Sequence, residues 1–235
     1  MIQKYLQIIF ILFLTIENIA ARNANDVYYI DKIFYDPTYD KAIYTGLSLG
    51  VVEASLSKEV FKTSTDDFTS SGDKIFSENF FISNLFVGYS FNSSLALEFA
   101  SSTLTSSSKT FNHTDLVWAA NNKKLKTTGK LSINLYSIDF LYREIIEEYM
   151  IPDVILGLGF GNAQMKKEIS YFADDVFVET KKITRDSLFL GVTIGLENVW
   201  DNGFGLRGYS KYRAYDDLPG IDNDLSLNIG VIKYF

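Results

Sequence analysis

Cysteine, proline, histidine and long apolar runs are scarce or missing in this sequence. The 235 residues include no cysteine, three prolines and one histidine. Without cysteine there is neither a disulfide framework nor a lipid-anchored lipoprotein, and three prolines exclude a proline-rich chain. Beyond the N-terminal segment there is no run of about 20 apolar residues, so no membrane-spanning helix is expected there.

Charge and metal-ligating residues narrow the function further. The formal net charge is -7, which argues against a nucleic-acid partner. A single histidine and no cysteine do not provide the ligand set of a typical zinc or transition-metal site. We therefore expect neither a metal nor another cofactor.

The N-terminus has the three parts of a secretory signal. Lys4 provides a basic start, residues 5–14 form an apolar stretch, and Ala20 and Ala21 are small residues suited to cleavage. We predict a signal peptide over residues 1–21. The alternative, an uncleaved membrane anchor, is disfavoured because the apolar stretch is short for a span. Residues 22–41 are polar and irregular, and we interpret them as a periplasmic N-terminal extension.

From residue 42 onward the apolar residues recur with a period of two, which is the period of β-strands. The residues at 186–198 show it most clearly. Leu188, Leu190, Val192, Ile194 and Leu196 lie on one face, and Ser187, Phe189, Gly191, Thr193, Gly195 and Glu197 lie on the other. The same alternation predicts strands at about 42–55, 80–92, 94–104, 131–142, 153–164, 186–198, 203–214 and 224–235.

The two faces of these strands differ in a way that indicates a membrane barrel. One face carries large aliphatic and aromatic residues, while the other is small, polar or charged and rich in glycine, as the narrow interior of a small barrel requires. Each apolar face extends for roughly 9–11 residues, the length of a tilted membrane strand. We predict an all-β protein, an antiparallel transmembrane up-and-down β-barrel of about eight strands over residues 42–235.

The connections between the predicted strands alternate in length. Long connections are expected at 56–79, 105–130 and 165–185, and tight turns at 92–94 and 201–203, where Asn-Gly favours a hairpin. The segment 143–152 is an exception that can form a short helical turn. Outer-membrane barrels have long loops outside the cell and short turns in the periplasm. An even number of strands then places both termini in the periplasm.

Charged residues of both signs fall on the predicted inner face: Glu98, Asp139, Glu197, Arg207 and Lys211, with Arg213 as a further candidate. Isolated buried charges are very unfavourable, so these groups are expected to pair. We predict a lumenal network in which Glu98 and Asp139 meet Arg207 and Lys211. This network can be a structural plug, the interpretation we favour, or the lining of a narrow polar pore.

Aromatic residues concentrate near the ends of the predicted strands, where girdles anchor a barrel at the membrane interfaces. Packing inside an ordinary core is the alternative. The residues concerned are Tyr89, Phe91, Tyr136, Phe140, Tyr142, Trp200, Phe204, Tyr212 and Phe235.

The charged and polar loops offer weaker candidates. His113 lies near Ser107, Ser108 and Asp115, but these residues crowd one loop and no nucleophile elbow is present, so we expect no enzyme. The second long loop is basic and can meet lipid phosphates or an anionic host surface. An acidic last loop lacks the spacing of a calcium loop, and we interpret both as solvated. The residues are Lys109, Lys123, Lys124, Lys126 and Lys130, and Asp216, Asp217, Asp222 and Asp224.

Two hairpins and the C-terminus resemble a known family. Residues 87–99 (VGYSFNSSLALEF) resemble the second-to-third hairpin of OmpA-like and opacity-type barrels, and residues 195–207 resemble the sixth-to-seventh. The chain ends in Phe235, as these proteins do for recognition by the barrel-assembly machinery. Lys233 departs from the outward apolar residue that is usual there. The resemblance implies an outer-membrane protein with variable surface loops and roles in adhesion, immune exposure, structural support or limited permeability.

These observations leave several functions open. We expect first a surface antigen, adhesin or structural barrel that acts through long extracellular loops, with outer-membrane lipid, the barrel-assembly machinery and host surface molecules as partners. The second possibility is a narrow porin for small solutes. The third is a soluble secreted β-barrel that binds an apolar ligand, although its outward glycines would then only weaken the strands.

Overall fold

The computed structural model describes residues 41–56, 76–118, 123–144, 152–200 and 202–235. The predicted signal peptide, 1–21, and nearly all of the predicted periplasmic extension, 22–41, lie outside the described residues, as does most of the segment 143–152. Within the described part of the chain, no helix is both long and apolar enough to cross a membrane.

Eight antiparallel strands form a closed barrel in which each strand pairs with its neighbours in sequence, and the first pairs with the last. This confirms the predicted fold class. The strands are β1 (Ile43–Leu56), β2 (Phe76–Ser90), β3 (Leu95–Trp118), β4 (Lys123–Glu144), β5 (Asp153–Ala173), β6 (Val176–Val199), β7 (Phe204–Tyr215) and β8 (Ile221–Tyr234).

The alternation read from the sequence corresponds to the two faces of the barrel wall. On β6 the residues from Ser187 to Val199 alternate between buried and exposed, with Leu190 70% exposed and Phe189 only 3% exposed. The same alternation holds on β7, where Arg207, Tyr209 and Lys211 are buried. Side chains of successive strand residues point to opposite faces of the sheet. The large aliphatic residues that recur at every second position therefore all lie on the outer surface of the barrel.

Two of the expected long loops are wrong, because the structure has strands there. β3 and β4 pair as far as Trp118 opposite Lys123, and β5 and β6 pair as far as Ala173 opposite Val176. The sequence did not reveal these strands because Ser, Thr and Lys are frequent on both of their faces, so the apolar alternation disappears. Backbone hydrogen bonds and β-branched residues such as Thr still favour the extended conformation.

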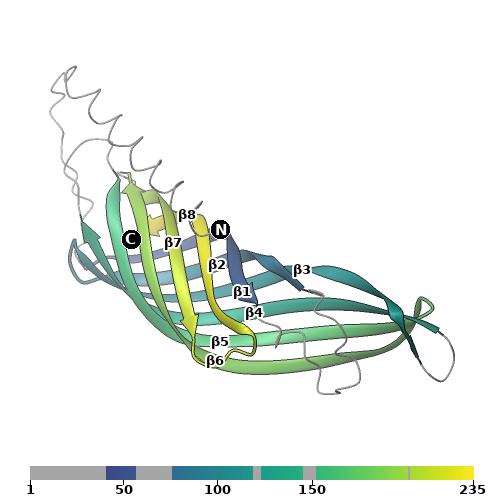
Figure 1. The fold of residues 1–235 in the computed structure, drawn as a ribbon. Helices are drawn as coiled ribbons and strands as arrows, with labels where there is room; N and C mark the ends of the chain where they lie inside the picture. The colour runs from purple at the N-terminus through teal and green to yellow at the C-terminus, as the bar shows by residue number, and fades with distance from the viewer. Residues whose placement is uncertain (1–40, 57–75, 119–122, 145–151, 201) are drawn as a thin grey trace, which may run out of the picture.

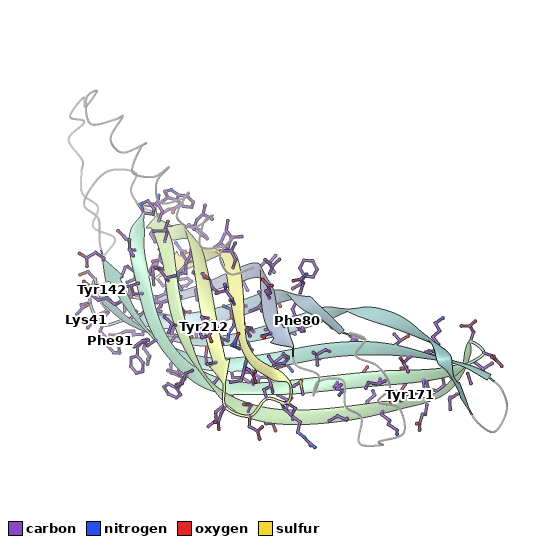
Figure 2. All side chains as sticks on the ribbon, in the orientation of Figure 1. Lys41, Phe80, Phe91, Tyr142, Tyr171 and Tyr212 are labelled. Carbon is purple, nitrogen blue, oxygen red and sulfur yellow. The ribbon has the colours of Figure 1, made fainter. Side chains whose placement is uncertain are left out.

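The outer parts of these four strands form a sheet that projects from the barrel, which we call the extension: residues 109–118, 123–130, 166–173 and 176–186. Figure 1 shows the extension continuing the wall of the barrel at one end, with β6 along one margin and β5 beside it. Lys41, Phe91 and Tyr142 lie together at the opposite end, and Tyr171 lies far out on the extension (Figure 2). We call the end that holds Lys41 and Phe235 the terminal rim.

Tight turns close the hairpins at the terminal rim. The Asn92 Oδ1 atom accepts hydrogen bonds from the backbone N–H groups of Ser94, at 2.9 Å, and Leu95, at 2.7 Å. Gly203 has a φ of 77°, in the left-handed region that favours glycine, and its N–H donates to the Trp200 carbonyl at 2.8 Å. Both short turns therefore lie where the sequence predicted them.

The barrel interior is filled by two apolar clusters with polar groups around and between them. This differs from the prediction that the inner face would be small and polar. The cluster nearer the terminal rim contains Ala42, Tyr44, Phe86, Ala96, Ala100, Leu141, Ile155, Ile232 and Tyr234. The cluster toward the extension contains Val52, Ala54, Phe80, Ile82, Leu104, Leu131, Ile133, Leu135, Ala163, Met165, Ile169, Tyr171, Phe189, Tyr215, Leu218 and Ile221.

Candidate functional site

Arg207 joins two carboxylates inside the barrel. Its Nη1 atom donates to Glu98 Oε2 and its Nε atom donates to Glu197 Oε2, both at 2.6 Å. The guanidinium also lies 4.8 Å from the centroid of the Phe86 ring and 5.5 Å from that of Tyr44. All three charged side chains are buried, so the two carboxylates offset the unfavourable burial of the arginine.

Arg143 and two tyrosines complete this cluster at the terminal rim. Glu197 Oε1 lies 3.3 Å from Arg143 Nε and accepts a hydrogen bond of 2.8 Å from the Tyr234 hydroxyl. Arg143 Nη2 donates to that hydroxyl at 2.7 Å, while the Tyr44 hydroxyl donates to Glu98 Oε2 at 3.2 Å. Each buried carboxylate therefore has several donors, the condition under which a buried charge is tolerated.

A second ion pair joins Lys211 to Asp139. Lys211 Nζ lies 2.6 Å from Asp139 Oδ1, and the Ser137 hydroxyl donates to Asp139 Oδ2 at 2.7 Å. A Cβ atom at Gly159 would lie only 1.8 Å from Asp139 Oδ1. Glycine is therefore required at 159 for Asp139 to adopt this position.

A third pair, Arg213 with Asp224, lies toward the extension. Arg213 Nη1 donates to Asp224 Oδ1, and the Tyr215 hydroxyl donates to Asp224 Oδ2. Arg213 Nη2 also donates to the Ser226 hydroxyl at 3.3 Å. Asp224 is only 1% exposed, so its assignment to a solvated acidic loop is wrong, and Asp222 is likewise in β8.

The structure places all five residues proposed for the lumen on the inner face. It brings Glu98 and Glu197 to Arg207, and Asp139 to Lys211. Sequence reasoning missed two members of the network. Arg143 comes directly after the outward-facing Tyr142, so strand alternation places it inside the barrel, but from the sequence it was assigned to the connection 143–152. Asp224 was assigned to the acidic last loop together with Asp216, Asp217 and Asp222.

Little open space remains around these charges. The cavity beside them has a volume of about 20 Å³ and is lined by Asn84, Glu98, Ala100, Asp139, Leu141, Ile155, Thr193, Arg207, Tyr209 and Lys211. A cavity needs about 10–15 Å³ to hold one water molecule, so this space suits about one water and no larger solute.

The outer wall of the barrel is apolar and exposed. Leu49 is 67%, Leu190 70% and Ile229 67% exposed, and many other large apolar side chains accompany them. Single exposed apolar residues are ordinary, but a belt that surrounds a closed barrel marks contact with an apolar medium. The apolar stretch of β1, Ile43–Val51, is about nine residues long, close to the 9–11 of a tilted membrane strand.

Aromatic side chains lie at the terminal rim of this belt. Phe91, Tyr142, Trp200, Phe204 and Phe235 are all exposed, as girdle residues at an interface are. The remaining members of the proposed girdle, Tyr89, Tyr136, Phe140 and Tyr212, are exposed as well. Packing inside an ordinary core is therefore wrong for the whole set.

The last residues are fixed by backbone and side-chain contacts. The Phe235 N–H donates to the Ile43 carbonyl at 2.9 Å, and its ring is 76% exposed. Lys233, the departure from the family pattern, donates from Nζ to the Asn202 carbonyl at 2.5 Å and lies 4.5 Å from the centroid of the Phe204 ring. The role of Phe235 as an assembly signal stays a prediction.

The extension carries one strongly perturbed lysine. Lys167 is only 4% exposed, and burial lowers the pKa of its ammonium group from 10.5 to about 8. Lys126 and Lys130 of the basic segment are closer to solvent. Lys126, for example, forms an ion pair of 3.0 Å with the exposed Asp175.

The described residues give no support to a catalytic site at His113 or to a metal site. The backbone of His113 pairs with Leu125 in the extension, and its side chain lies outside what the structure describes, as do those of Ser107, Ser108 and Asp115. Among the described residues, no group of three or more His, Cys, Asp or Glu side chains is placed to hold a metal ion.

Fold and wall together define a closed eight-stranded barrel with a filled lumen and an apolar exterior. Neither a protein family model nor a curated protein sequence matches the chain. Solved structures similar to it include Ail, the attachment invasion locus protein of Yersinia pestis, with 16% identity, a TM-score of 0.48, and coverage of 83% of this chain and 99% of that one.

Two further structures are similar over the same part of the chain. Neisserial surface protein A has 13% identity, a TM-score of 0.45, and coverage of 82% of this chain and 97% of that one. A major outer membrane protein from Thermus thermophilus has 14% identity, a TM-score of 0.48, and coverage of 83% and 100%. These are small outer-membrane barrels, the class that the sequence motifs resemble. At these identities the likeness concerns the fold.

Proposed function

We propose that this chain is an outer-membrane barrel with a sealed lumen, which acts at the cell surface through the extension. The observation that carries this proposal is the combination of an exposed apolar wall with a lumen filled by apolar clusters and paired charges. In water such a wall would be very unfavourable, because each square ångström of exposed apolar surface costs about 25 cal/mol. Against lipid it costs little.

The N-terminal segment supports the location. A signal peptide over residues 1–21 would export the chain, and a final Phe235 would present it to the barrel-assembly machinery. With both termini in the periplasm, the terminal rim faces the periplasm and the extension faces the outside of the cell. The extension then takes the place of the long extracellular loops as the surface that host molecules can meet.

A soluble ligand-binding barrel fits the side-chain arrangement less well. Such a barrel would turn its large apolar residues inward around a cavity, whereas Leu47, Leu158 and Leu190 are more than half exposed. Its interior would also have to hold a ligand, and the lumenal cavity of about 20 Å³ is too small for one.

Conductance separates the sealed barrel from the narrow porin. Protein purified from bacterial outer membranes and inserted into planar lipid bilayers is expected to give no discrete channel currents, because Arg207 and Lys211 cross the lumen in closed ion pairs. Insertion is verified separately by protease protection of the barrel in vesicles of the same lipid. Stepwise currents from inserted protein would contradict a sealed lumen and favour the porin.

A further inference from the structure

The margin of the extension formed by β6 has a long free edge. Residues 176–186 of β6 are exposed or half-exposed throughout, and Val176 is 64% and Phe177 57% exposed. Strand β7 starts to pair with β6 only at Phe189, opposite Tyr215. Among the described residues no strand pairs with residues 176–186 on the side away from β5, and Figure 1 shows β6 on the margin of the sheet.

The backbone direction shows which residues of this edge can receive a partner strand. The Leu188 carbonyl accepts a hydrogen bond of 2.9 Å from the Asp216 N–H, so Leu188 directs its backbone groups to the β7 side. Successive residues of a strand alternate in this respect. The backbone groups of Thr180, Lys182 and Thr184 therefore point to the free edge, where they form a template for another strand.

We propose that the partner of this edge is β6 of a second copy of this chain, paired antiparallel with Thr180 opposite Thr180. In this register Glu179 faces Lys181 of the other copy, and the β-bulge between Phe177 and Glu179 ends the regular pairing beyond this contact. The contact between Glu179 and Lys181 occurs twice because the pair is two-fold symmetric. Cross-strand pairs of opposite charge stabilise a sheet, as do apolar pairs, whereas like charges placed directly opposite each other destabilise it.

The neighbouring self-paired registers are less favourable. A shift that puts residue 181 on the two-fold axis places Lys181 directly opposite Lys181, and the next shift places Lys182 opposite Lys182. Both registers bring two ammonium groups together on the two-fold axis, and like charges placed directly opposite each other destabilise the pairing. In the remaining registers, a residue whose backbone groups point to the free edge would lie opposite a residue whose backbone groups point away from it. The two strands could not then form the hydrogen bonds of an antiparallel pair.

The direction of the strands indicates that the two copies belong to opposing membranes. This step rests on the proposed function, in which the extension projects outward from the membrane. Two copies in one membrane are related by a rotation about the membrane normal. Strand β6 therefore runs toward the membrane in both copies, and the two strands point in the same direction along the normal. Antiparallel pairing of outward-projecting strands therefore joins barrels that face each other, as in contact between two cells.

The absence of cysteine makes the register directly testable. Thr180→Cys, purified from membranes in detergent, is expected to form a disulfide-linked dimer under mild oxidation, because the two residues face each other within disulfide range. Thr184→Cys is the matched control on the same edge, since the two copies of residue 184 lie far apart along the paired strands in this register. Failure of Thr180→Cys to crosslink, or equal crosslinking of both variants, would overturn the register.

A charge exchange tests the opposing arrangement. Vesicles that carry the native chain are expected to cluster, as measured by light scattering, while Glu179→Lys alone or Lys181→Glu alone lowers the clustering rate by about tenfold through like-charge contacts. Mixing vesicles of the two variants restores opposite charges at every contact and is expected to restore clustering. Mixed vesicles that stay apart would overturn the proposal.

The two failures can be told apart. Gel mobility of unheated protein reports whether each variant forms the membrane barrel, independently of pairing. Heat-modifiable variants that neither crosslink nor cluster would overturn the edge pairing and leave the proposed function standing. Crosslinking in detergent without vesicle clustering would overturn the arrangement between opposing membranes.

Discussion

Arg207 shows at the residue scale why the lumen can hold charge. Its guanidinium lies between Glu98 and Glu197, at 2.6 Å from each, and the three groups are almost fully buried. Removing one member of such a group leaves a buried charge without its counter-ion, which typically costs about 3–5 kcal/mol, whereas replacing the whole group by neutral residues costs far less. This asymmetry gives a test of the network.

Arg207→Met is expected to lower the free energy of unfolding by about 3–5 kcal/mol, because Glu98 and Glu197 then repel each other inside the barrel. Urea unfolding in lipid vesicles measures the change. The double variant Glu98→Gln, Arg207→Met is the control, and it should recover most of the loss, because Glu197 keeps Arg143 as its counter-ion at 3.3 Å. An Arg207→Met variant within about 0.5 kcal/mol of the native protein would show that the ion pairs do not hold the lumen together.

The sequence located most of the network by a simple rule. Glu98, Asp139 and Glu197 occupy the faces opposite the large apolar residues of their strands, so strand alternation places them inside. Arg143 and Asp224 were missed because each adjoins a segment rich in charge, where alternation between apolar and polar residues stops. Which carboxylate meets which cation depends on the strand register, and no single-residue pattern encodes that.

At the scale of elements, the extension is the part that the sequence could not predict. Its four strands have polar residues on both faces, so the pattern that identifies a half-buried strand is absent. The inner face nevertheless contains buried groups, among them Ile169, Tyr171 and Lys167. The buried lysine makes the stability of this element sensitive to pH.

Lys167 provides the element-scale prediction. Burial lowers the pKa of Lys167 to about 8 in the folded state, below the ordinary 10.5. Between these values the unfolded chain binds more protons than the folded chain, so stability increases with pH across this interval. Relative to Lys167→Met, the native protein should gain about 1 kcal/mol in free energy of unfolding from pH 7 to pH 9.

Urea unfolding of both proteins at the two pH values measures this gain, and taking the difference between them cancels the titration of all other groups. A difference that stays constant with pH, or that changes in the opposite direction, would mean that Lys167 keeps an ordinary pKa.

At the scale of the whole molecule, the distribution of apolar surface determines where the protein can exist. The terminal rim carries exposed aromatic residues, the middle of the wall carries exposed aliphatic residues together with Phe99 and Phe160, and the extension carries charge. This order matches the layers of a membrane followed by water. The approximate number of strands, the closed barrel and the apolar wall could all be predicted from the sequence. Apolar residues recur at every second position, with large side chains on one face and small ones on the other, and few folds other than a barrel have this pattern.

The central claim is that the chain is a membrane barrel, and the mobility of the unheated protein tests it most directly. Protein folded in detergent is run on a denaturing gel with and without boiling, with far-ultraviolet circular dichroism measured alongside. We expect a β-rich protein that needs detergent and migrates faster unheated than boiled, because the closed barrel resists the denaturant. A protein that is monomeric in water without detergent and shows no change in mobility would contradict it.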